Sequence, residues 1–431
     1  MIEEFSFGNF WSFKEIQTLN MTAAKIKSTN SDLDFNNVIH LSDKLNLLKS
    51  KAIYGANASG KSNIIKALIA FIRIVKDSVK DENILNIIDS FKLSTETIGK
   101  PTFFQLIMRI DNVKYRYGFE ADDKSIKSEW LYFTPKLREQ NLFIRENGKI
   151  ISISQAHFKE GSRYIKLMEG DSEEQIFRNN SLFISSLAAF GFGKISKNVV
   201  TAITSITIIN GLGHQGMYSI AGSSLDDTIM KDFILKFLKK ADTGIEAIES
   251  IEINQEDLPE NIREEIKKDF EKSNKKTIVS SRYLYNENLN KEGLENFSFL
   301  VQESEGTKKM FELSPFIYKT LKEGGTLVID EFDSRFHPLL TKKIVELFNS
   351  PENSKSQLIF ITHDTNLLSS DLLRRDQIDF VEKDNYGASH LYTLVEIKGV
   401  RNNASFEKDY IQGKYGAIPF LGNFNKLLNI E

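Results

Sequence analysis

The chain has 431 residues, long enough for roughly two or three domains or for one large domain with an insertion, and 41% of its residues are hydrophobic and 27% charged, a balance typical of folded globular proteins. Its net charge of −3 excludes a global basic field that would draw it onto nucleic acid, although 56 Lys and Arg residues leave room for a local basic face. The absence of cysteine excludes disulfides, thiolate metal sites and cysteine nucleophiles.

Two features bear on the cellular compartment. The N-terminal stretch MIEEFSFGNF is acidic and lacks the basic-then-apolar layout of a secretory signal. Among the most apolar stretches, SLFISSLAAFGFG at 181–193 is too short and too polar to span a bilayer. We therefore expect a cytoplasmic protein with no membrane partner.

The first part of the chain alternates strand and helix signals. Its predicted elements are two short strands within 1–21 around a turn at Gly8–Asn9, a polar loop with a short helix at 28–46, a buried strand at 52–54, a helix after Lys61, and a meander of strands within 102–119 and 127–133.

The character changes after about residue 150 and returns near residue 326. The middle part predicts short strands at 149–154 and 250–253, a helix at 227–241, and a charge-dense solvated helix at 255–276. The last part predicts a strand at 326–330, a helix near 339–349, a strand at 357–362, and two closing strands within 377–384 and 390–397. We therefore expect an α/β core split into 1–150 and 301–431 by an α/β insertion at 151–300.

The stretch GANASGKS at 55–62 lies between a predicted strand and a predicted helix. Glycine permits the tight turn, inward-pointing amides and the positive end of the helix can hold phosphate oxygens, Lys61 can reach the β- and γ-phosphates, and Ser62 can ligate magnesium. The alternative, an incidental polar turn, is disfavoured by this context. The candidate nucleotide-binding residues are Gly55, Asn57, Ala58, Ser59, Gly60, Lys61, Ser62 and Asn63.

Two apolar strands end in side chains suited to phosphate hydrolysis. TLVIDEFD at 326–333 delivers Asp330, which can hold Mg²⁺ through water, and Glu331, which can orient or deprotonate an attacking water. LIFITHDTNLL at 358–368 delivers His363, which can donate a hydrogen bond to the γ-phosphate. Each alone is typical of a solvated strand end, but beside a phosphate loop both predict ATP hydrolysis.

A second anion-binding corner is predicted at the start of a helix. Ser304, Glu305, Gly306 and Thr307 precede the apolar face of the helix that follows, and they stand about twenty residues before the Asp330–Glu331 pair. On its own such a sequence is a common helix start. Its position before the acidic strand makes it informative.

The order GANASGKS, SEGT, LVIDEFD and ITHD resembles the ABC-type ATPase heads of the SMC, RecF and OLD group, and in particular the RloA/AbiL-like ATPases of bacterial anti-phage and abortive-infection systems. FSFGNFWSFKE near the start, DEFDSRFHP as an acidic motif plus D-loop, and YIQGKYGAIPFL at 410–421 resemble further segments of this group. The resemblance covers both halves of the head and matches the middle part only loosely.

The resemblance implies a P-loop head with a mixed sheet flanked by helices, and a site shared between two chains. Lys61, Ser62, Asp330, Glu331 and His363 would act in cis, whereas Ser304, Gly306 and Thr307 would close on the nucleotide of another copy. The implied partners are a second copy, as a head-to-head homodimer or an oligomer of dimers, and a separately encoded effector such as a nuclease, with nucleic acid as a further candidate.

Three functions stay open. The first is a dimerising ATPase switch in anti-phage defence, the second a RecF-like repair ATPase that clamps duplex DNA, and the third a transporter subunit, which SEGT in place of SGGQ disfavours. Some side chains stay unassigned. Gln105 and Gln140 are candidates for the Q-loop glutamine, and Trp11 and Phe13 could each stack on adenine or belong to the core. The pair Lys308–Lys309 is expected to face water rather than nucleic acid, and His337 is a candidate for the subunit interface. Four further histidines show no metal-ligand spacing: His40, His157, His214 and His390.

Overall fold

The computed structural model describes residues 1–42, 45–168, 178–212, 215–252, 276–401 and 404–419. The charge-dense helix expected at 255–276 lies outside the described residues apart from Lys276, and so does His214, one of the four histidines without metal-ligand spacing. Among the helices that are described, none has both the length and the apolar character that a bilayer crossing requires.

A six-stranded, mostly parallel sheet carries the motifs. In spatial order its strands are β11 (Thr207–Asn210), β15 (Gly325–Asp330), β16 (Ser356–Ile361), β5 (Ser50–Gly55), β17 (Ile378–Lys383) and β18 (Ser389–Thr393), with only β18 antiparallel to its neighbour. The strands expected at 52–54, 326–330, 357–362 and 377–384 are confirmed as β5, β15, β16 and β17. β5 and β16 are buried along their whole length, which explains the apolar runs AIY and LIFI within them.

The middle part of the chain contributes to this sheet. Strand β11 pairs in parallel with β15, and its last residue, Asn210, stands opposite Asp330. The segment between residues 150 and 300 therefore supplies one edge strand of the motif-bearing sheet. The domain boundaries at these two residues stay a proposal.

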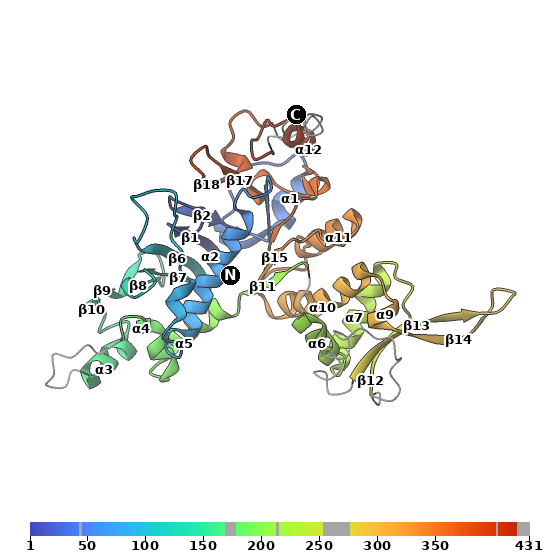
Figure 1. The fold of residues 1–431 in the computed structure, drawn as a ribbon, viewed down its shortest axis with the longest axis horizontal. Helices are drawn as coiled ribbons and strands as arrows, with labels where there is room; N and C mark the ends of the chain where they lie inside the picture. The colour runs from blue at the N-terminus through green and yellow to red at the C-terminus, as the bar shows by residue number, and fades with distance from the viewer. Residues whose placement is uncertain (43–44, 169–177, 213–214, 253–275, 402–403, 420–431) are drawn as a thin grey trace, which may run out of the picture.

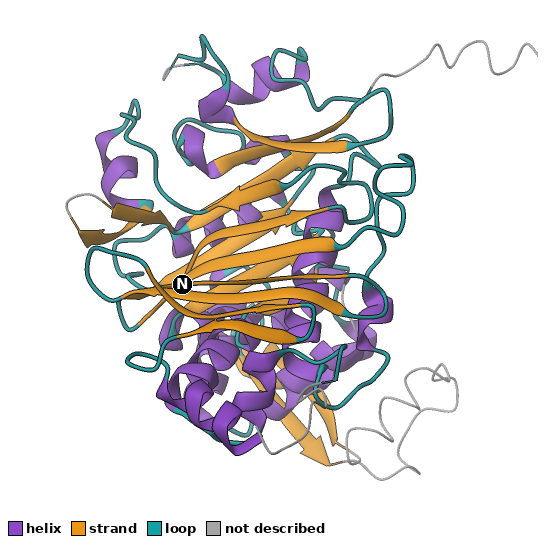
Figure 2. Cartoon of the chain, turned by 90° about the vertical axis from the view of Figure 1, so that its left-hand side faces the viewer, coloured by secondary structure: helices purple, strands orange, loops and turns teal. Residues whose placement is uncertain are grey.

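An antiparallel sheet lies beside the parallel one. Its strands in spatial order are β10 (Lys149–Ile153), β9 (Gln140–Glu146), β8 (Ile126–Thr134), β7 (Val113–Ala121), β6 (Thr102–Ile110), β1 (Ile2–Gly8) and β2 (Gln17–Asn20). The expected meander is confirmed by β6, β7 and β8, and the expected N-terminal pair by β1 and β2. Figure 2 shows the strands running through the middle of the molecule with many of the helices gathered below them.

Helix α2 (Lys61–Asp77) and helix α10 (Glu305–Glu323) cover opposite faces of the parallel sheet. Because side chains alternate along a strand, Val328 of β15 faces the core that holds α2, whereas Leu327 and Ile329 face the core that holds α10. On the α2 side, Phe71 packs against rings of the antiparallel sheet. Figure 1 shows α2 and α10 on opposite sides of β15.

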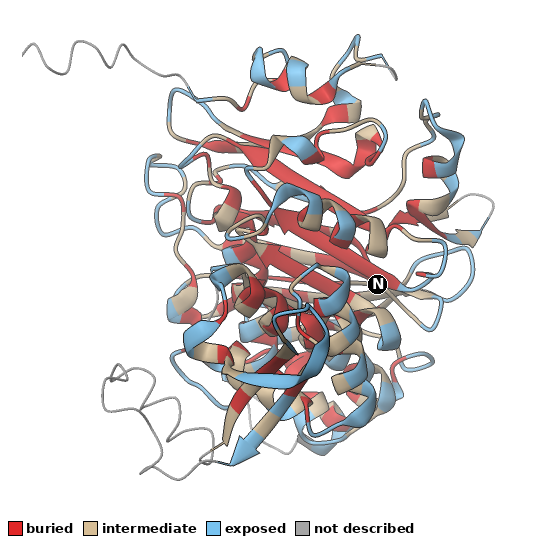
Figure 3. Cartoon of the chain, turned by 90° about the vertical axis from the view of Figure 1, so that its right-hand side faces the viewer, coloured by how far each residue is buried: buried red, intermediate tan, exposed pale blue. Residues whose placement is uncertain are grey.

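The remaining helices cover the sheets and build a separate lobe. They are α3 (Lys159–Met168), α4 (Phe183–Ala189), α5 (Lys194–Thr204), α6 (Gln215–Ser224), α7 (Thr228–Lys240), α9 (Phe299–Gln302), α11 (Pro338–Phe348) and α12 (Phe406–Ile411). Helices α6, α7, α9 and α10 share a core with a three-stranded sheet made of β12 (Ala247–Glu252), β13 (Lys276–Tyr285) and β14 (Lys291–Ser298). This lobe projects to one side in Figure 1, and Figure 3 shows how much more exposed it is than the central strands.

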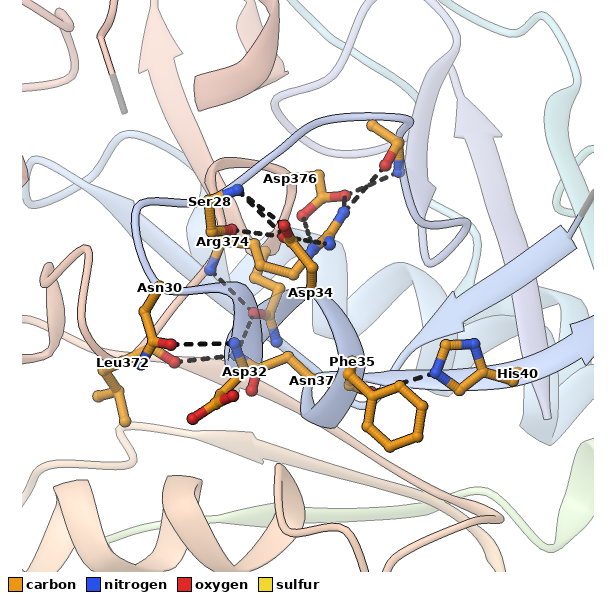
Figure 4. Close-up of polar contacts among 12 residues, drawn as sticks. Ser28, Asn30, Asp32, Asp34, Phe35, Asn37, His40, Leu372, Arg374 and Asp376 are labelled. Atoms are coloured by element: carbon orange, nitrogen blue, oxygen red, sulfur yellow. Dashed lines mark hydrogen bonds and ion pairs between the residues drawn. The ribbon is translucent and has the colours of Figure 1, made fainter. Parts of the chain in front are cut away.

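The polar stretch 28–46 holds more structure than expected. The expected short helix is α1 (Ser31–Asn36), but a hairpin of β3 (Val38–Ser42) and β4 (Leu45–Leu48) follows it. The buried Arg374 ties α1 to the C-terminal half, since its guanidinium donates to Asp34 at 2.8 Å and to Asp376 at 2.7 and 2.9 Å (Figure 4). Paired guanidinium and carboxylate groups of this kind lock the two halves of the chain together.

Candidate functional site

The phosphate loop connects β5 to α2, and two of its glycines are required by geometry. Gly55 has φ +157°, and a Cβ there would lie 2.4 Å from the carbonyl oxygen of Val381 on β17. Gly60, at the start of α2, has φ +112°, and a Cβ there would lie 2.4 Å from the hydroxyl of Ser389. Both backbone conformation and space therefore exclude side chains at these two positions.

The ammonium group of Lys61 lies folded over the base of this loop. It donates to the carbonyl oxygens of Gly55 at 2.8 Å and Ala56 at 2.9 Å, and the residue is 6% exposed. Burial lowers the pKa of Lys61, while Glu331 and Asp330 oppose that shift through their charges. A buried cation held by carbonyls alone is well suited to receive an anion.

The loop also holds a buried hydroxyl that has no protein partner. Ser59 is 4% exposed, and among the described residues its Oγ finds no hydrogen-bond partner. That hydroxyl lies toward Gly55, because a Cβ on Gly55 would come within 2.7 Å of it. Buried polar atoms without partners are rare, so this one fits a site whose phosphate oxygens complete it. Asn57 and Ala58 form the exposed crest of the loop.

The end of β15 meets the start of α2. The hydroxyl of Ser62 lies 3.4 Å from Oδ1 of Asp330, and the same carboxylate oxygen accepts the backbone N–H of Glu331 at 3.0 Å. Hydroxyl and carboxylate oxygens are the ligands that Mg²⁺ prefers, so this pair fits the expected metal. Glu331 has φ +53°, a strained conformation for a residue with a side chain, of the kind that clusters at functional sites.

Asp333 joins the ends of β15 and β16, a role that sequence reasoning missed. Its Oδ1 accepts the hydroxyl of Thr362 at 2.7 Å and the backbone N–H of His363 at 3.0 Å. His363 is exposed at the same sheet edge as the phosphate loop. The signal was present in the sequence, because Asp333 is the last residue of the acidic stretch TLVIDEFD.

Two serines that no motif predicted brace the phosphate loop from outside. The hydroxyl of Ser389 donates to the carbonyl oxygen of Ser59 at 2.5 Å and lies within hydrogen-bond distance, 2.8 Å, of the hydroxyl of Ser12. Asn63, one of the expected nucleotide-binding residues, donates to that same Ser12 hydroxyl at 2.8 Å. Ser12 follows β1 and Ser389 begins β18, so strands from both sheets hold the loop in place.

The second corner begins α10 at the same edge of the sheet but on the other face. Ser304 is exposed, and its hydroxyl caps the helix by accepting the backbone N–H of Thr307 at 3.1 Å. In the part of the chain that is described, no hydrogen bond joins 304–307 to the phosphate loop. Gly306 packs against the segment after β15, since a Cβ there would lie 2.9 Å from the carbonyl oxygen of Arg335.

A family model matches residues 52–165 and 209–369, more than half of the chain, and its description reads AAA domain, putative AbiEii toxin, Type IV TA system. The chain belongs to this AAA family. The two matched segments contain the phosphate loop, the Ser304 corner, the acidic strand end and His363. The fold of this AAA family member is α/β, with a mixed sheet flanked by helices.

Solved structures similar to this AAA chain include three SMC heads. The SMC head domain from Thermotoga maritima is 14% identical with a TM-score of 0.40, and the match covers 91% of this chain and 98% of that one. An SMC head bound to the C-terminal winged-helix domain of ScpA is 15% identical with a TM-score of 0.43, and the match covers 91% of this chain and 97% of that one. An SMC head with an extended coiled coil, bound to the C-terminal domain of ScpA derived from Pyrococcus furiosus, is 14% identical with a TM-score of 0.39. That match covers 91% of this chain and 96% of the other. None of the curated proteins compared with the chain matches it.

The burial of several side chains of this AAA chain bears on the roles expected of them. Lys309 is 2% exposed, so the expectation that both lysines of the 308–309 pair face water is wrong for this one. Phe13 is fully buried against Phe7 and belongs to the core, whereas Trp11 is 42% exposed. Thr307, expected to reach another copy, is buried beneath Ser304.

The remaining candidates take structural positions. Gln105 accepts hydrogen bonds from Arg116 and Trp130 on the antiparallel sheet, and the described hydrogen bonds connect neither it nor Gln140 to the phosphate loop. His337 caps α11 by accepting the backbone N–H of Leu339. His40 and His390 contact Phe35 and Asp384, His157 lies against Phe133, and no cluster suited to a metal ion is found among the described acidic and histidine side chains.

Proposed function

We propose that the chain binds ATP with Mg²⁺ and hydrolyses it at sites shared by two copies. The single observation that carries this proposal is the placement of two half-sites on opposite faces of one sheet. One half-site is the loop with Lys61 and the partnerless Ser59 hydroxyl, and the other is the exposed tip of α10 at Ser304. Among the described residues no hydrogen bond joins the two half-sites within one chain, and two chains facing each other would bring the exposed tip of one to the loop of the other.

Each residue has a defined task in this proposal. Lys61 binds the β- and γ-phosphates together with the loop amides, and Ser62 and Asp330 are the ligands that would hold Mg²⁺, which neutralises phosphate charge when bound. Glu331 orients or deprotonates the attacking water, and His363 donates a hydrogen bond to the γ-phosphate. Ser304 and Gly306 of the other copy seal the phosphates with a helix N-terminus, while Thr307 orients Ser304.

Mixing two inactive variants tests whether the site is shared. Lys61→Ala removes phosphate binding and leaves the α10 tip, whereas Ser304→Arg blocks the tip and leaves the loop. We expect neither to hydrolyse ATP alone, and an equimolar mixture to recover activity up to about one quarter of the wild-type rate, because half of randomly formed dimers hold one intact site of two. The measurement is phosphate release at several protein concentrations.

The control for this experiment is Asn30→Arg, which removes the cap of α1 and adds a cation far from the nucleotide. It should keep the wild-type rate. Full activity of Ser304→Arg, or a mixture no more active than its components, would contradict the shared site.

We further propose that ATP-driven dimerisation switches a separately encoded effector, such as a nuclease, during bacterial defence against phage, in the cytoplasm. The family description, which names a toxin–antitoxin system, supports a defence role. The test is phage challenge of cells that carry the chain with its neighbouring genes, in wild-type and Lys61→Ala forms. Equal plaque counts would contradict it, and ATP-dependent duplex binding with a steep salt dependence would favour the RecF-like alternative.

Trp11 is the proposed platform for adenine. Its ring is partly exposed, it precedes the loop-bracing Ser12, and the ammonium of Lys66 lies 4.0 Å from the ring centroid. Since stacking of a base on an aromatic ring contributes about 1–3 kcal/mol, Trp11→Ala should raise the Kd for ATP about tenfold. The measurement is calorimetric titration with ATP.

The chain's two tryptophans allow a sharper readout of the same prediction. In Trp130→Phe only Trp11 remains, and ATP binding should quench its tryptophan fluorescence. In Trp11→Phe, where only Trp130 remains, ATP should cause no quenching. An unchanged Kd in Trp11→Ala would show that the base lies elsewhere.

A further inference from the structure

Lys309, in the first turns of α10, is a buried cation held by the segment that follows the acidic strand. Its ammonium donates to the carbonyl oxygens of Phe332 at 2.9 Å, Ser334 at 2.5 Å and Glu331 at 3.4 Å. It also lies 4.2 Å from the ring centroid of Phe336. All of these contacts belong to the stretch 331–336, so one side chain of α10 binds residues along the whole turn that follows Asp330.

Burying this ammonium is unfavourable. Among the described ion pairs none involves Lys309, and burial lowers its pKa to about 8 even though Asp333, Glu331 and Glu312 act to raise it; the nearby Arg335 lowers it further. An apolar side chain would fill the same space without that cost. The convergence of three carbonyls on the cation is therefore the feature that needs a functional explanation.

The turn that Lys309 holds is strained and touches the tip of α10 at further points. Glu331 has φ +53° and Arg335 has φ +63°, conformations that persist only where the surroundings enforce them. The guanidinium of Arg335 donates to the carboxylate of Glu305 at 2.8 Å, and the backbone carbonyl oxygen of Arg335 packs against Gly306. The tip of α10 and the Glu331 turn thus form one connected body.

We propose that Lys309 is a positioning residue that fixes the turn at 331–336 to the tip of α10. The tip, which is offered to a second copy, and Glu331, which acts on the chain's own nucleotide, then move together. This inference rests on the proposed function. When Ser304 of one copy closes on the other's phosphates, Lys309 carries that movement to Glu331 of its own chain. The two sites of a dimer therefore become competent together, and hydrolysis is cooperative in ATP.

Lys309→Met tests this link, because it keeps the aliphatic stem and removes the donors. We expect an unchanged Kd for ATP, a kcat lowered roughly 10- to 100-fold by displacement of Glu331, and a Hill coefficient near 1. Lys308→Met is the matched control, since its ammonium contacts Glu305 at the surface rather than the turn. It should keep the wild-type kcat and cooperativity.

The pH profile adds a readout that loss of packing would not produce. Below about pH 8 Lys309 is an ammonium with three donors, and above it a neutral amine with two, too few for three carbonyls. The wild-type kcat should therefore fall as the pH rises through about 8, with ATP affinity retained. Lys309→Met should be low and flat over the same range.

Different results separate the inference from the function on which it rests. Wild-type kcat and cooperativity in Lys309→Met would overturn the inference and leave the ATPase proposal standing, whereas no hydrolysis by the wild type would overturn both. If Lys309→Met loses ATP binding through misfolding, Arg335→Gln decides, because it cuts the second link at an exposed side chain. Reduced cooperativity in Arg335→Gln supports the link, and unchanged cooperativity excludes it.

Discussion

Replacing Lys61 by alanine is expected to abolish nucleotide binding. The ammonium is the one cation that the structure places inside the phosphate loop, within the part of the chain that it describes, and no neighbouring side chain can take its place. Truncating one partner of a buried charge pair costs about 2–5 kcal/mol, so the Kd for ATP should rise by roughly 30-fold or more. Calorimetric titration with ATP and Mg²⁺ measures this change.

Thermal unfolding provides the second measurement for Lys61→Ala. A ligand that binds only the folded state raises Tm by mass action, so ATP should raise Tm of the wild type and leave that of the variant unchanged. Lys76→Ala is the matched control, because Lys76 is exposed at the far end of the same helix. If ATP raised Tm of Lys61→Ala as much as that of the wild type, the phosphates would not be bound by this loop.

The parts of the fold that the sequence predicted well are those with strong local signals. β5, β15 and β16 each contain an apolar run that stands shortly before a glycine, an acid or a histidine, and α2 carries a clear apolar face. The β3–β4 hairpin was missed because half-polar strands of this kind depend on their tertiary neighbours. β11 was missed because four residues carry too weak a pattern, and only its pairing with β15 defines it.

The candidate site divides in the same way. The motif residues, named from their types, their places beside predicted strands and helices and a family resemblance, do gather at one edge of the parallel sheet, although their chemical roles stay predictions. Ser12 and Ser389 were missed because they meet across 377 positions of sequence. Lys309 was assigned to the surface because lysine is almost never fully buried, and nothing local reveals three carbonyls converging on it.

Replacing Glu331 by glutamine is expected to separate ATP binding from hydrolysis. Glutamine has nearly the same shape and leaves Lys61, Ser62 and the contact between Ser62 and Asp330 in place, so the Kd for ATP should stay close to that of the wild type. The amide cannot accept a proton from the attacking water, and loss of a general base lowers kcat by roughly 100- to 10,000-fold. Phosphate release measures this loss, with Glu323→Gln, exposed at the other end of α10, as the matched control.

The same variant should trap the closed dimer. In the proposed site the phosphates hold two chains together until they are cleaved, so a variant that binds but does not cleave accumulates the joined state. Light scattering with ATP and Mg²⁺ should then report twice the chain mass of 49.3 kDa for Glu331→Gln, and a smaller dimer fraction for the wild type as it turns over. Adding Ser304→Arg to Glu331→Gln should return the mass to that of one chain, because the seal is lost while the phosphate loop is intact. A monomer in ATP-bound Glu331→Gln would mean that the tip of α10 closes on something other than a second copy's nucleotide.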